Sequence, residues 1–204
     1  MLRIALAKGR LESESISHLE RCGYTFLEKS DRKLLIRDSE NNIELLSVKP
    51  LDVPVYVYSG IADIGICGTD SIVESGLSLI QPMKLPFGIC SMVVASFPGF
   101  KFNGRRTKIA TKFPISTKKY LSSKSIDADI IKLNGSVELA PVVGLADAIV
   151  DIVQTGRTLK EHGLTIIDEV YKISAMVCVN NVSYRTKRMD LQFLFDKLWK
   201  VLDS

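Results

Sequence analysis

The sequence predicts an α/β fold built as two lobes with mainly parallel sheets. Short apolar runs rich in β-branched residues alternate with stretches of helical periodicity, which is the pattern of parallel strands joined by helices. A strand-loop-helix motif also occurs twice, which indicates two units of similar build. With 204 residues, the chain is long enough for two small lobes that each bury a core.

The expected strands are the short apolar runs between turn-forming residues. Helices fit between them, and the final helix is the clearest because its apolar residues recur at helical spacing with charges opposite. Its apolar stripe consists of Leu191, Leu194, Phe195, Leu198 and Leu202. The expected strands span residues 3–7, 34–37, 43–48, 63–67, 92–95, 108–111, 129–133, 147–150 and 173–179.

The repeated motif reads GIADIGICG from Gly60 followed by ESGLSLI, and GLADAIVDI from Gly144 followed by EHGLTII. Each copy predicts a strand, a loop, a helix that ends at glycine, and the next strand. The second copy is three residues longer, where the sequence TGRT lies. This pattern is explained by two lobes of related build, in which the longer loop of the second lobe binds phosphate. Chance similarity of two generic βα units is the alternative.

Composition and charge exclude several classes of protein. The hydrophobic and charged fractions, 46% and 25%, are typical of a folded domain and not of a disordered chain. The formal charge of +4 is small and spread along the chain, so we expect no nucleic-acid partner and favour a small polyanionic substrate. One local cluster is interpreted as a solvated face: Arg105, Arg106, Lys108, Lys112, Lys118 and Lys119.

Cysteine and histidine counts narrow the chemistry. The four cysteines form no C-x-x-C pair, so they are interpreted as reduced core residues and not as zinc ligands or disulfides. With only His18 and His162, the histidine count disfavours a histidine-based triad or a multi-histidine metal centre. No signal peptide or membrane-spanning run is recognised, so we expect a cytosolic protein that is not membrane-bound.

Residues 149–159, IVDIVQTGRTL, carry the clearest chemical signal. An apolar strand ends at Asp151, and a Thr-Gly-x-Thr loop then opens a helix. Helix-start amides, the hydroxyls of Thr155 and Thr158, and a glycine that permits close approach form a phosphate cradle. Asp151 lies at a distance suited to ribose hydroxyls, so the segment predicts a ribose phosphate site. The alternative is that Thr155 or Thr158 only caps the helix.

The same region resembles the ATP phosphoribosyltransferase family. Phosphoribosyltransferases of the commonest type place two adjacent acids before a TTG loop, but Val150 precedes Asp151 here, which favours another branch. The family signature is matched by Glu138, Gly144, Ala146, Ile149, Asp151, Ile152, Thr155, Gly156, Thr158 and Leu159. Further similar segments are KGRL at 8–11, DRKL at 31–34, VKPLDVP at 48–54, ADIGICGTD at 62–70 and LNGSVELAP at 133–141. Because the chain stops near Asp203, it resembles the short form, which lacks a C-terminal regulatory domain.

The resemblance implies a two-lobed fold like that of type II periplasmic-binding proteins, with the ligand in the interlobe cleft. Residues 1–88 and 175–204 would form lobe I, and residues 89–174 lobe II with the phosphoribosyl-binding loop. The implied reaction transfers the phosphoribosyl group from phosphoribosyl pyrophosphate to N1 of ATP, releasing pyrophosphate, as the first step of histidine biosynthesis. Mg²⁺, a homo-oligomer and a separate regulatory subunit resembling a histidyl-tRNA synthetase are expected as cofactor and partners.

The resemblance also assigns site residues. The 5′-phosphate is expected at Thr155, Gly156, Arg157 and Thr158, and the ribose hydroxyls at Asp151 and Glu138. Candidates for contact with pyrophosphate and the phosphates of ATP are the cations Lys8, Arg10, Arg32 and Lys49.

The expected catalytic residues are Asp151, Lys8 and Lys49. From the sequence alone, each of the four cations could equally be an ordinary surface residue. Lys49 stands where several relatives have arginine, which keeps the charge but removes a bidentate contact.

Two other functions are weighed against this one. A solute-binding module without enzymatic activity shares the implied fold, but such proteins are usually exported and do not need a ribose-phosphate loop. A phosphoribosyltransferase with a different acceptor base is the second alternative.

Overall fold

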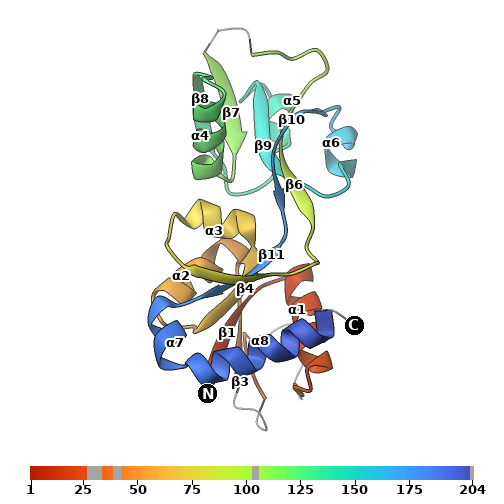
Figure 1. Ribbon diagram of the computed structural model, residues 1–204. Helices are drawn as coiled ribbons and strands as arrows, with labels where there is room; N and C mark the ends of the chain where they lie inside the picture. Colours follow the sequence, from red (N-terminus) through yellow and green to blue (C-terminus); the bar gives the residue numbers. More distant parts are fainter. Residues whose placement is uncertain (27–33, 39–42, 103–105, 203–204) are drawn as a thin grey trace. The chain divides into compact units, whose positions relative to one another are not determined.

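The chain folds into two compact units, which are seen in a computed structural model that describes residues 1–26, 34–38, 43–102 and 106–202 (Figure 1). Unit 1 comprises Met1–Gly88 and Ser174–Ser204, and unit 2 comprises Ile89–Ile173. The chain therefore leaves unit 1 once and returns to it once.

Unit 1 contains a six-stranded sheet in the order β2-β3-β1-β4-β11-β5. The central strands β3, β1 and β4 are parallel, whereas β2, β11 and β5 pair antiparallel with their neighbours. The strand bounds are β1 (Leu2–Ala7), β2 (Leu35–Asp38), β3 (Ile43–Val48), β4 (Ile64–Gly68), β5 (Ile80–Lys84) and β11 (Ala175–Val179).

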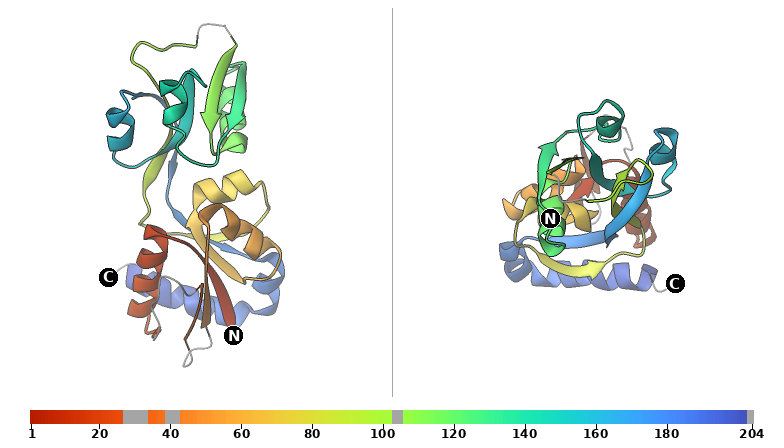
Figure 2. Two further views of the ribbon diagram at one scale, coloured as in Figure 1. Left: turned by 180° about the vertical axis from the view of Figure 1, so that it is seen from behind. Right: turned by 90° about the horizontal axis from the view of Figure 1, so that it is seen from above.

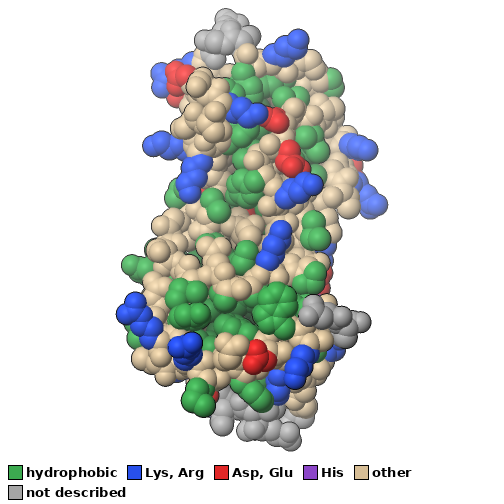
Figure 3. Space-filling view, in the orientation of Figure 1, with side chains coloured by type: hydrophobic (Ala, Val, Ile, Leu, Met, Phe, Trp, Pro, Cys, Tyr) green, Lys and Arg blue, Asp and Glu red, His purple; other side chains and the backbone are tan. Residues whose placement is uncertain are grey.

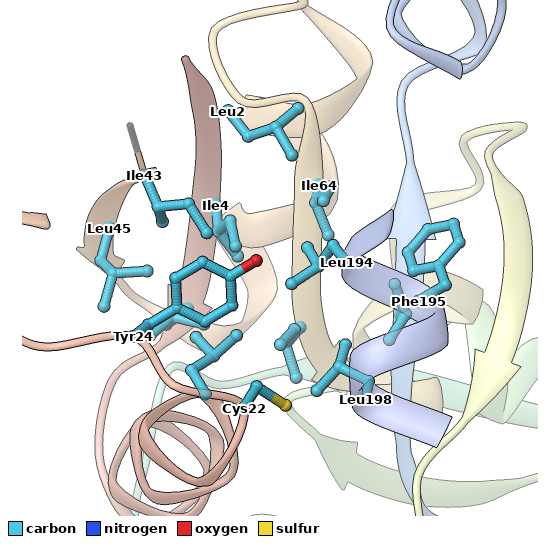
Figure 4. Packing of buried hydrophobic residues seen from close by; sticks show 14 of the residues in the cluster. Leu2, Ile4, Cys22, Tyr24, Ile43, Leu45, Ile64, Leu194, Phe195 and Leu198 are labelled. Carbon is cyan, nitrogen blue, oxygen red and sulfur yellow. The ribbon is translucent and has the colours of Figure 1, made fainter. Parts of the chain in front are cut away.

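Helices cover both faces of this sheet. Helices α1 (Arg10–Arg21) and α8 (Arg188–Leu202) pack on one face, where Leu194, Phe195 and Leu198 meet the strand residues (Figure 4). The predicted apolar stripe of the final helix is thus confirmed as part of the core. The other face holds α2 (Val53–Tyr58) and α3 (Thr69–Ser75), and η1 (Pro50–Asp52) and α7 (Asn181–Thr186) complete the unit.

Unit 2 contains a five-stranded sheet in the order β10-β6-β9-β7-β8. Strands β9, β7 and β8 are parallel, and β6 and β10 are antiparallel. Helix α4 covers one face, and α5 lies on the other (Figure 2). The element bounds are β6 (Cys90–Ser96), β7 (Thr107–Thr111), α4 (Pro114–Ser123), β8 (Ala128–Lys132), α5 (Leu139–Val142), β9 (Ala148–Val153), α6 (Arg157–Glu161) and β10 (Thr165–Ile173).

The repeated motif has the same structure in both units. The amide of Arg3 in β1 donates to Asp63 Oδ2 at 2.9 Å, and the amide of Lys108 in β7 donates to Asp147 Oδ2 at 2.7 Å. In each unit the aspartate precedes a strand parallel to its partner strand, β4 beside β1 and β9 beside β7. The predicted two-lobed α/β fold is confirmed. The expected parallel pairing holds for β3, β1 and β4 and for β9, β7 and β8, whereas the other neighbouring strands pair antiparallel.

Two edge strands, β5 and β10, lie almost entirely outside the expected strand ranges and were anticipated only as the strands that follow the glycine stops of the repeated motif. Each has features that weaken its own strand signal. Strand β5 contains Pro82, and proline depresses strand propensity although an edge strand tolerates it. Strand β10 is only partly buried and has two register shifts against β6, which disrupt the alternation that signals a strand.

Surface and cysteine features agree with the expectations from composition. Lysine and arginine side chains are dispersed over the drawn face, with acidic side chains among them (Figure 3). The four cysteines are free thiols, of which Cys90 is half-buried and the others are buried. Within the described ranges, none of the helices has the length and apolar character needed to cross a membrane.

Gly65 allows α2 to pack closely on β4. A Cβ atom at this position would lie 2.7 Å from Val53, Val57 and Cys178 side-chain atoms. Gly65→Ala is expected to lower the free energy of unfolding by about 1–3 kcal/mol through overpacking, as measured by urea unfolding. Gly135→Ala is the matched control, because a Cβ there meets nothing within 4 Å, and equal effects of both changes would contradict the packing argument.

Glu44 is fully buried at the end of the sheet, where it accepts hydrogen bonds from Arg37 and Arg3. The Arg37 hydrogen bond outweighs burial and, with that from Arg3, lowers the pKa of the Glu44 carboxyl group. A lowered folded-state pKa contributes stability that is present above the unfolded-state pKa and is lost as the pH falls through the folded-state pKa.

Glu44→Gln is therefore expected to lower the free energy of unfolding by about 1.5–3 kcal/mol at neutral pH. The difference from the wild type should shrink as the solution is acidified, because the wild-type carboxylate is then lost as well. Denaturant unfolding at a series of pH values measures this, and a difference that stays constant with pH would contradict the assignment.

Candidate active site

The loop between β9 and α6 has the local structure expected of a ligand cradle. Gly156 has φ 72° and ψ 8°, a left-handed conformation that favours glycine, and it is the residue from which α6 begins. Thr155 precedes this position and Thr158 follows it, and no side chain caps the helix. The alternative that Thr155 or Thr158 serves only as the N-cap is therefore wrong.

The loop and two carboxylates line one cavity of about 320 Å³. The hydroxyl-bearing residues and Arg157 are exposed, whereas Asp151 and Glu138 are half-buried. Leu159 anchors the short helix, because its side chain is buried in the core of unit 2. The residues around the cavity are Glu138, Asp151, Ile152, Val153, Gln154, Thr155, Gly156, Arg157, Thr158 and Leu159.

Asp151 combines burial with a mixed electrostatic surrounding. Burial is the largest influence and raises the pKa of the Asp151 carboxyl group, and the negative charge of Glu138 raises it further. A hydrogen bond from the amide of Ile152, 2.8 Å long, and the positive charge of Lys112 act in the opposite direction. The net effect is a raised pKa of the Asp151 carboxyl group. A ligand that brings hydrogen-bond donors or a cation would therefore stabilise the ionised carboxylate.

A second cavity of about 490 Å³ lies against the other side of the same loop. It shares Val153 to Gly156 with the smaller cavity, but its remaining walls come from β6, β10 and α6 and include aliphatic side chains such as Val93 and Ile166. Neither Asp151 nor Glu138 lines it. The smaller cavity is therefore the one with the groups that a ribose phosphate needs.

The predicted cations lie in unit 1. Ala7 is the register partner of Val48, so Lys8 and Lys49 follow the neighbouring ends of β1 and β3, and both are exposed. Arg10 is the first residue of α1, and its side chain lies 3.5 Å from Glu14. Arg32 lies outside the described residues. The structure thus brings Lys8 and Lys49 together at the carboxyl ends of two adjacent parallel strands.

The residues around the cavity suit a metal that is held mainly by its substrate. Within the described parts of the chain, no group of three or more His, Cys, Asp or Glu side chains could hold a metal ion. Asp151 and Glu138 are the two carboxylates of the cavity. Mg²⁺ commonly binds through one or two carboxylates together with substrate phosphate oxygens, so these residues fit it.

Asp151 lies within β9, which continues to Val153 and does not end at Asp151 as expected. An α/β fold in which this carboxylate and a glycine-centred loop at a helix start share one cavity favours the phosphoribosyltransferase class. Comparison with known proteins narrows this class. Residues 49–200 match the family described as HisG: ATP phosphoribosyltransferase. Similar proteins named ATP phosphoribosyltransferase occur in Thermotoga neapolitana, with 46% identity over all of this chain and 96% of the relative, and in Clostridioides difficile, with 45% identity over 100% and 99%.

Solved structures agree with these relatives. A chain of the ATP phosphoribosyl transferase (HisG:HisZ) complex from Thermotoga maritima is 46% identical, with a TM-score of 0.89 over 100% of this chain and 99% of that one. A protein from Archaeoglobus fulgidus is 10% identical with a TM-score of 0.63, covers 99% of this chain and 76% of its own, and shares the fold alone.

The chain therefore belongs to the ATP phosphoribosyltransferase family. It is an enzyme that transfers the phosphoribosyl group from phosphoribosyl pyrophosphate to ATP in the first step of histidine biosynthesis. The family resemblance and the reaction inferred from it are confirmed. The two alternatives, a solute-binding module and a transferase for another acceptor, are excluded.

Proposed function

We propose that the 320 Å³ cavity binds phosphoribosyl pyrophosphate, with the 5′-phosphate on the loop and the ribose over Asp151. The observation that carries the proposal is that the loop and the two carboxylates line the same cavity. The phosphate is held by the hydroxyls of Thr155 and Thr158, the guanidinium of Arg157, and amides at the start of α6, which have no partner within the helix.

Asp151 accepts hydrogen bonds from the ribose hydroxyls, and Glu138 assists it. Burial has raised the pKa of Asp151, so hydroxyl donors and positive charge stabilise its ionised form on binding. Asp151 and Glu138 are the residues that would hold Mg²⁺, which would supply positive charge to stabilise the pyrophosphate leaving group.

The reaction breaks the bond between C1 of the ribose and the pyrophosphate oxygen and forms a bond between C1 and N1 of the adenine of ATP. The electron pair of the broken bond leaves with pyrophosphate, and positive charge develops at C1 and the ring oxygen. The carboxylate of Asp151 stabilises that charge, so no nucleophilic side chain is required.

We also propose phosphate contacts for the cations of unit 1. Lys8 and Lys49, which follow adjacent strand ends, contact the phosphates of pyrophosphate or ATP, and Arg10 and Arg32 are further candidates. Both substrates are strongly anionic, and lysine side chains neutralise phosphate charge as flexible point charges.

The expected partners and location extend the proposal. A solved relative is a HisG:HisZ complex, which supports the proposal that this chain also assembles with a regulatory subunit, one resembling a histidyl-tRNA synthetase. We expect the enzyme to act in the cytosol and as a homo-oligomer.

The test is incubation of the purified chain with ATP, phosphoribosyl pyrophosphate and Mg²⁺, with and without the regulatory subunit. N1 substitution changes the ultraviolet absorbance of adenine, and pyrophosphate is measured in parallel. Both signals are expected to rise together and to require ATP and Mg²⁺. Product formation at full rate without Mg²⁺ would overturn the metal assignment, and failure of ribose 5-phosphate to bind would overturn the cradle.

A further inference from the structure

Lys112 directly follows the carboxyl end of β7. The neighbouring parallel strand, β9, carries Asp151. Thr111, the last residue of β7, is the register partner of Val150, which precedes Asp151 in β9. The Thr111 hydroxyl donates to the carbonyl of Val150 at 2.7 Å and accepts from the amide of Phe113 at 2.9 Å. These bonds fix the end of β7 against β9 and place Lys112 beside Asp151.

Asp151 lies on the face of the sheet that carries α6, and the charge of Lys112 reaches it. Ala110 and Ile149, each two residues earlier, pack in the core cluster that includes Leu159 of α6. Side chains two residues apart along a strand point to the same face, so Asp151 is on the side of α6 and the cavity. Lys112 lies just beyond the last residue of β7, next to this position. The positive charge of Lys112 does act on Asp151. Lys112 is half-buried and, among the described residues, forms no ion pair within 4 Å.

The phosphate loop, Asp151 and Lys112 are arranged in this order across the carboxyl ends of neighbouring strands. The larger cavity joins the loop to β6 and β10, so the phosphate loop lies on the β6 side of β9, whereas Lys112 lies on the β7 side. In a ribose 5-phosphate, C5 is attached to ring carbon C4, and C4 and C1 are the two ring carbons that flank the ring oxygen, so the 5′-phosphate and the C1 substituent leave the ring at different carbons. A donor with its 5′-phosphate on the loop and its ribose over Asp151 therefore directs its C1 substituent toward β7.

From this placement we infer that Lys112 binds the pyrophosphate group of the donor. The inference rests on the proposed binding mode of the ribose phosphate. When the bond at C1 breaks, the electron pair moves to the pyrophosphate oxygen, and the ammonium group of Lys112 stabilises the negative charge that develops there. Lys112 is thus a substrate-contacting residue and not part of a solvated face.

Other basic residues near Lys112 in the sequence have different surroundings. Arg106 lies at the opposite end of β7 and pairs with Asp129 at 2.7 Å. Lys108 lies near that same end, and Lys118 and Lys119 are exposed on α4, which covers the other face of the sheet. Lys112 is therefore the residue to test, and Lys108, which lies within β7, is its matched control.

The experiment compares two probes on the full chain in the presence of Mg²⁺: inorganic pyrophosphate and ribose 5-phosphate, each titrated by calorimetry. Lys112→Met, which removes the charge but keeps the length, is expected to weaken pyrophosphate binding by about tenfold to a hundredfold. Affinity for ribose 5-phosphate should stay unchanged, because its phosphate lies on the loop. Lys112→Arg should keep most of the pyrophosphate affinity, and Lys108→Met should keep all of it.

The results distinguish a wrong role for Lys112 from a wrong binding mode for the ribose phosphate. If Lys112→Met binds pyrophosphate as tightly as the wild type while ribose 5-phosphate still binds, the role of Lys112 is wrong and the cradle stands. If the wild type does not bind ribose 5-phosphate, the underlying binding mode is wrong. Equal loss of both affinities in Lys112→Met would indicate a structural role and also overturn the inference. Lys112→Gln provides a second uncharged variant if the methionine variant does not fold.

Discussion

Asp151→Asn is expected to reduce turnover by about 100-fold or more while the protein remains folded. The amide has the same shape as the carboxylate, and its oxygen can still accept the hydrogen bond from Ile152. It lacks the negative charge that stabilises positive charge at C1 and that a metal would contact, and loss of one positioned electrostatic group commonly costs a factor of about 10²–10³. Pyrophosphate release gives turnover, and circular dichroism tests the fold.

The pH profile provides a second measurement of the same residue. Burial and the charge of Glu138 raise the pKa of Asp151, so wild-type turnover should decline on acidification at a higher pH than an ordinary aspartate would give. This acid limb should disappear in Asp151→Asn. Asp129→Asn is the control, because Asp129 pairs with Arg106 at the surface of the same unit. An Asp151→Asn variant with wild-type turnover and an unchanged acid limb would remove Asp151 from the site.

Thr158→Ala is expected to weaken donor binding by about tenfold to a hundredfold. The hydroxyl is exposed at the rim of the cavity, in the first turn of α6, and a hydrogen bond to a charged phosphate contributes about 1.5–3 kcal/mol. Alanine favours the helix, so stability should not fall with affinity. Calorimetry with phosphoribosyl pyrophosphate measures the change directly.

Thr165→Ala is the control for Thr158→Ala and also distinguishes the two cavities. Thr165 lines only the larger cavity, on β10. Its replacement should leave donor affinity unchanged if the smaller cavity holds the donor. The opposite result, in which Thr165→Ala weakens binding and Thr158→Ala does not, would move the donor to the larger cavity.

The cradle could be predicted because its parts are contiguous. Residues 149–159 contain the strand, the carboxylate, the loop and the helix start, so local chemistry alone indicates a phosphate site. The sequence could not decide which residue is the N-cap of the helix, because a Thr-Gly-x-Thr segment is compatible with either threonine in that position. The structure answers this question, since Gly156 is the N-cap and has a left-handed conformation.

Lys112 could not be predicted because its position depends on strand pairing. Thr111 and Val150 are 39 residues apart in sequence, and only the register of β7 against β9 brings Lys112 to Asp151. Within the sequence, Lys112 is one member of a basic cluster, and nothing local separates it from Lys118 and Lys119. The extents of the edge strands β5 and β10 could not be predicted for a related reason, since pairing with β11 and β6 stabilises these strands more than their own composition does.

The position of β11 between β4 and β5 has a consequence for biosynthesis. A nascent chain emerges from its N-terminus, so β4 and β5 are made long before Ala175–Val179, the strand that joins them. The backbone hydrogen-bonding groups of β4 and β5 that face β11 stay unpaired until that strand is synthesised. Unit 2, in contrast, is one uninterrupted segment that contains all of its own strands. The inserted unit can therefore mature on the ribosome while the earlier one still has open edges, which are surfaces prone to wrong pairing.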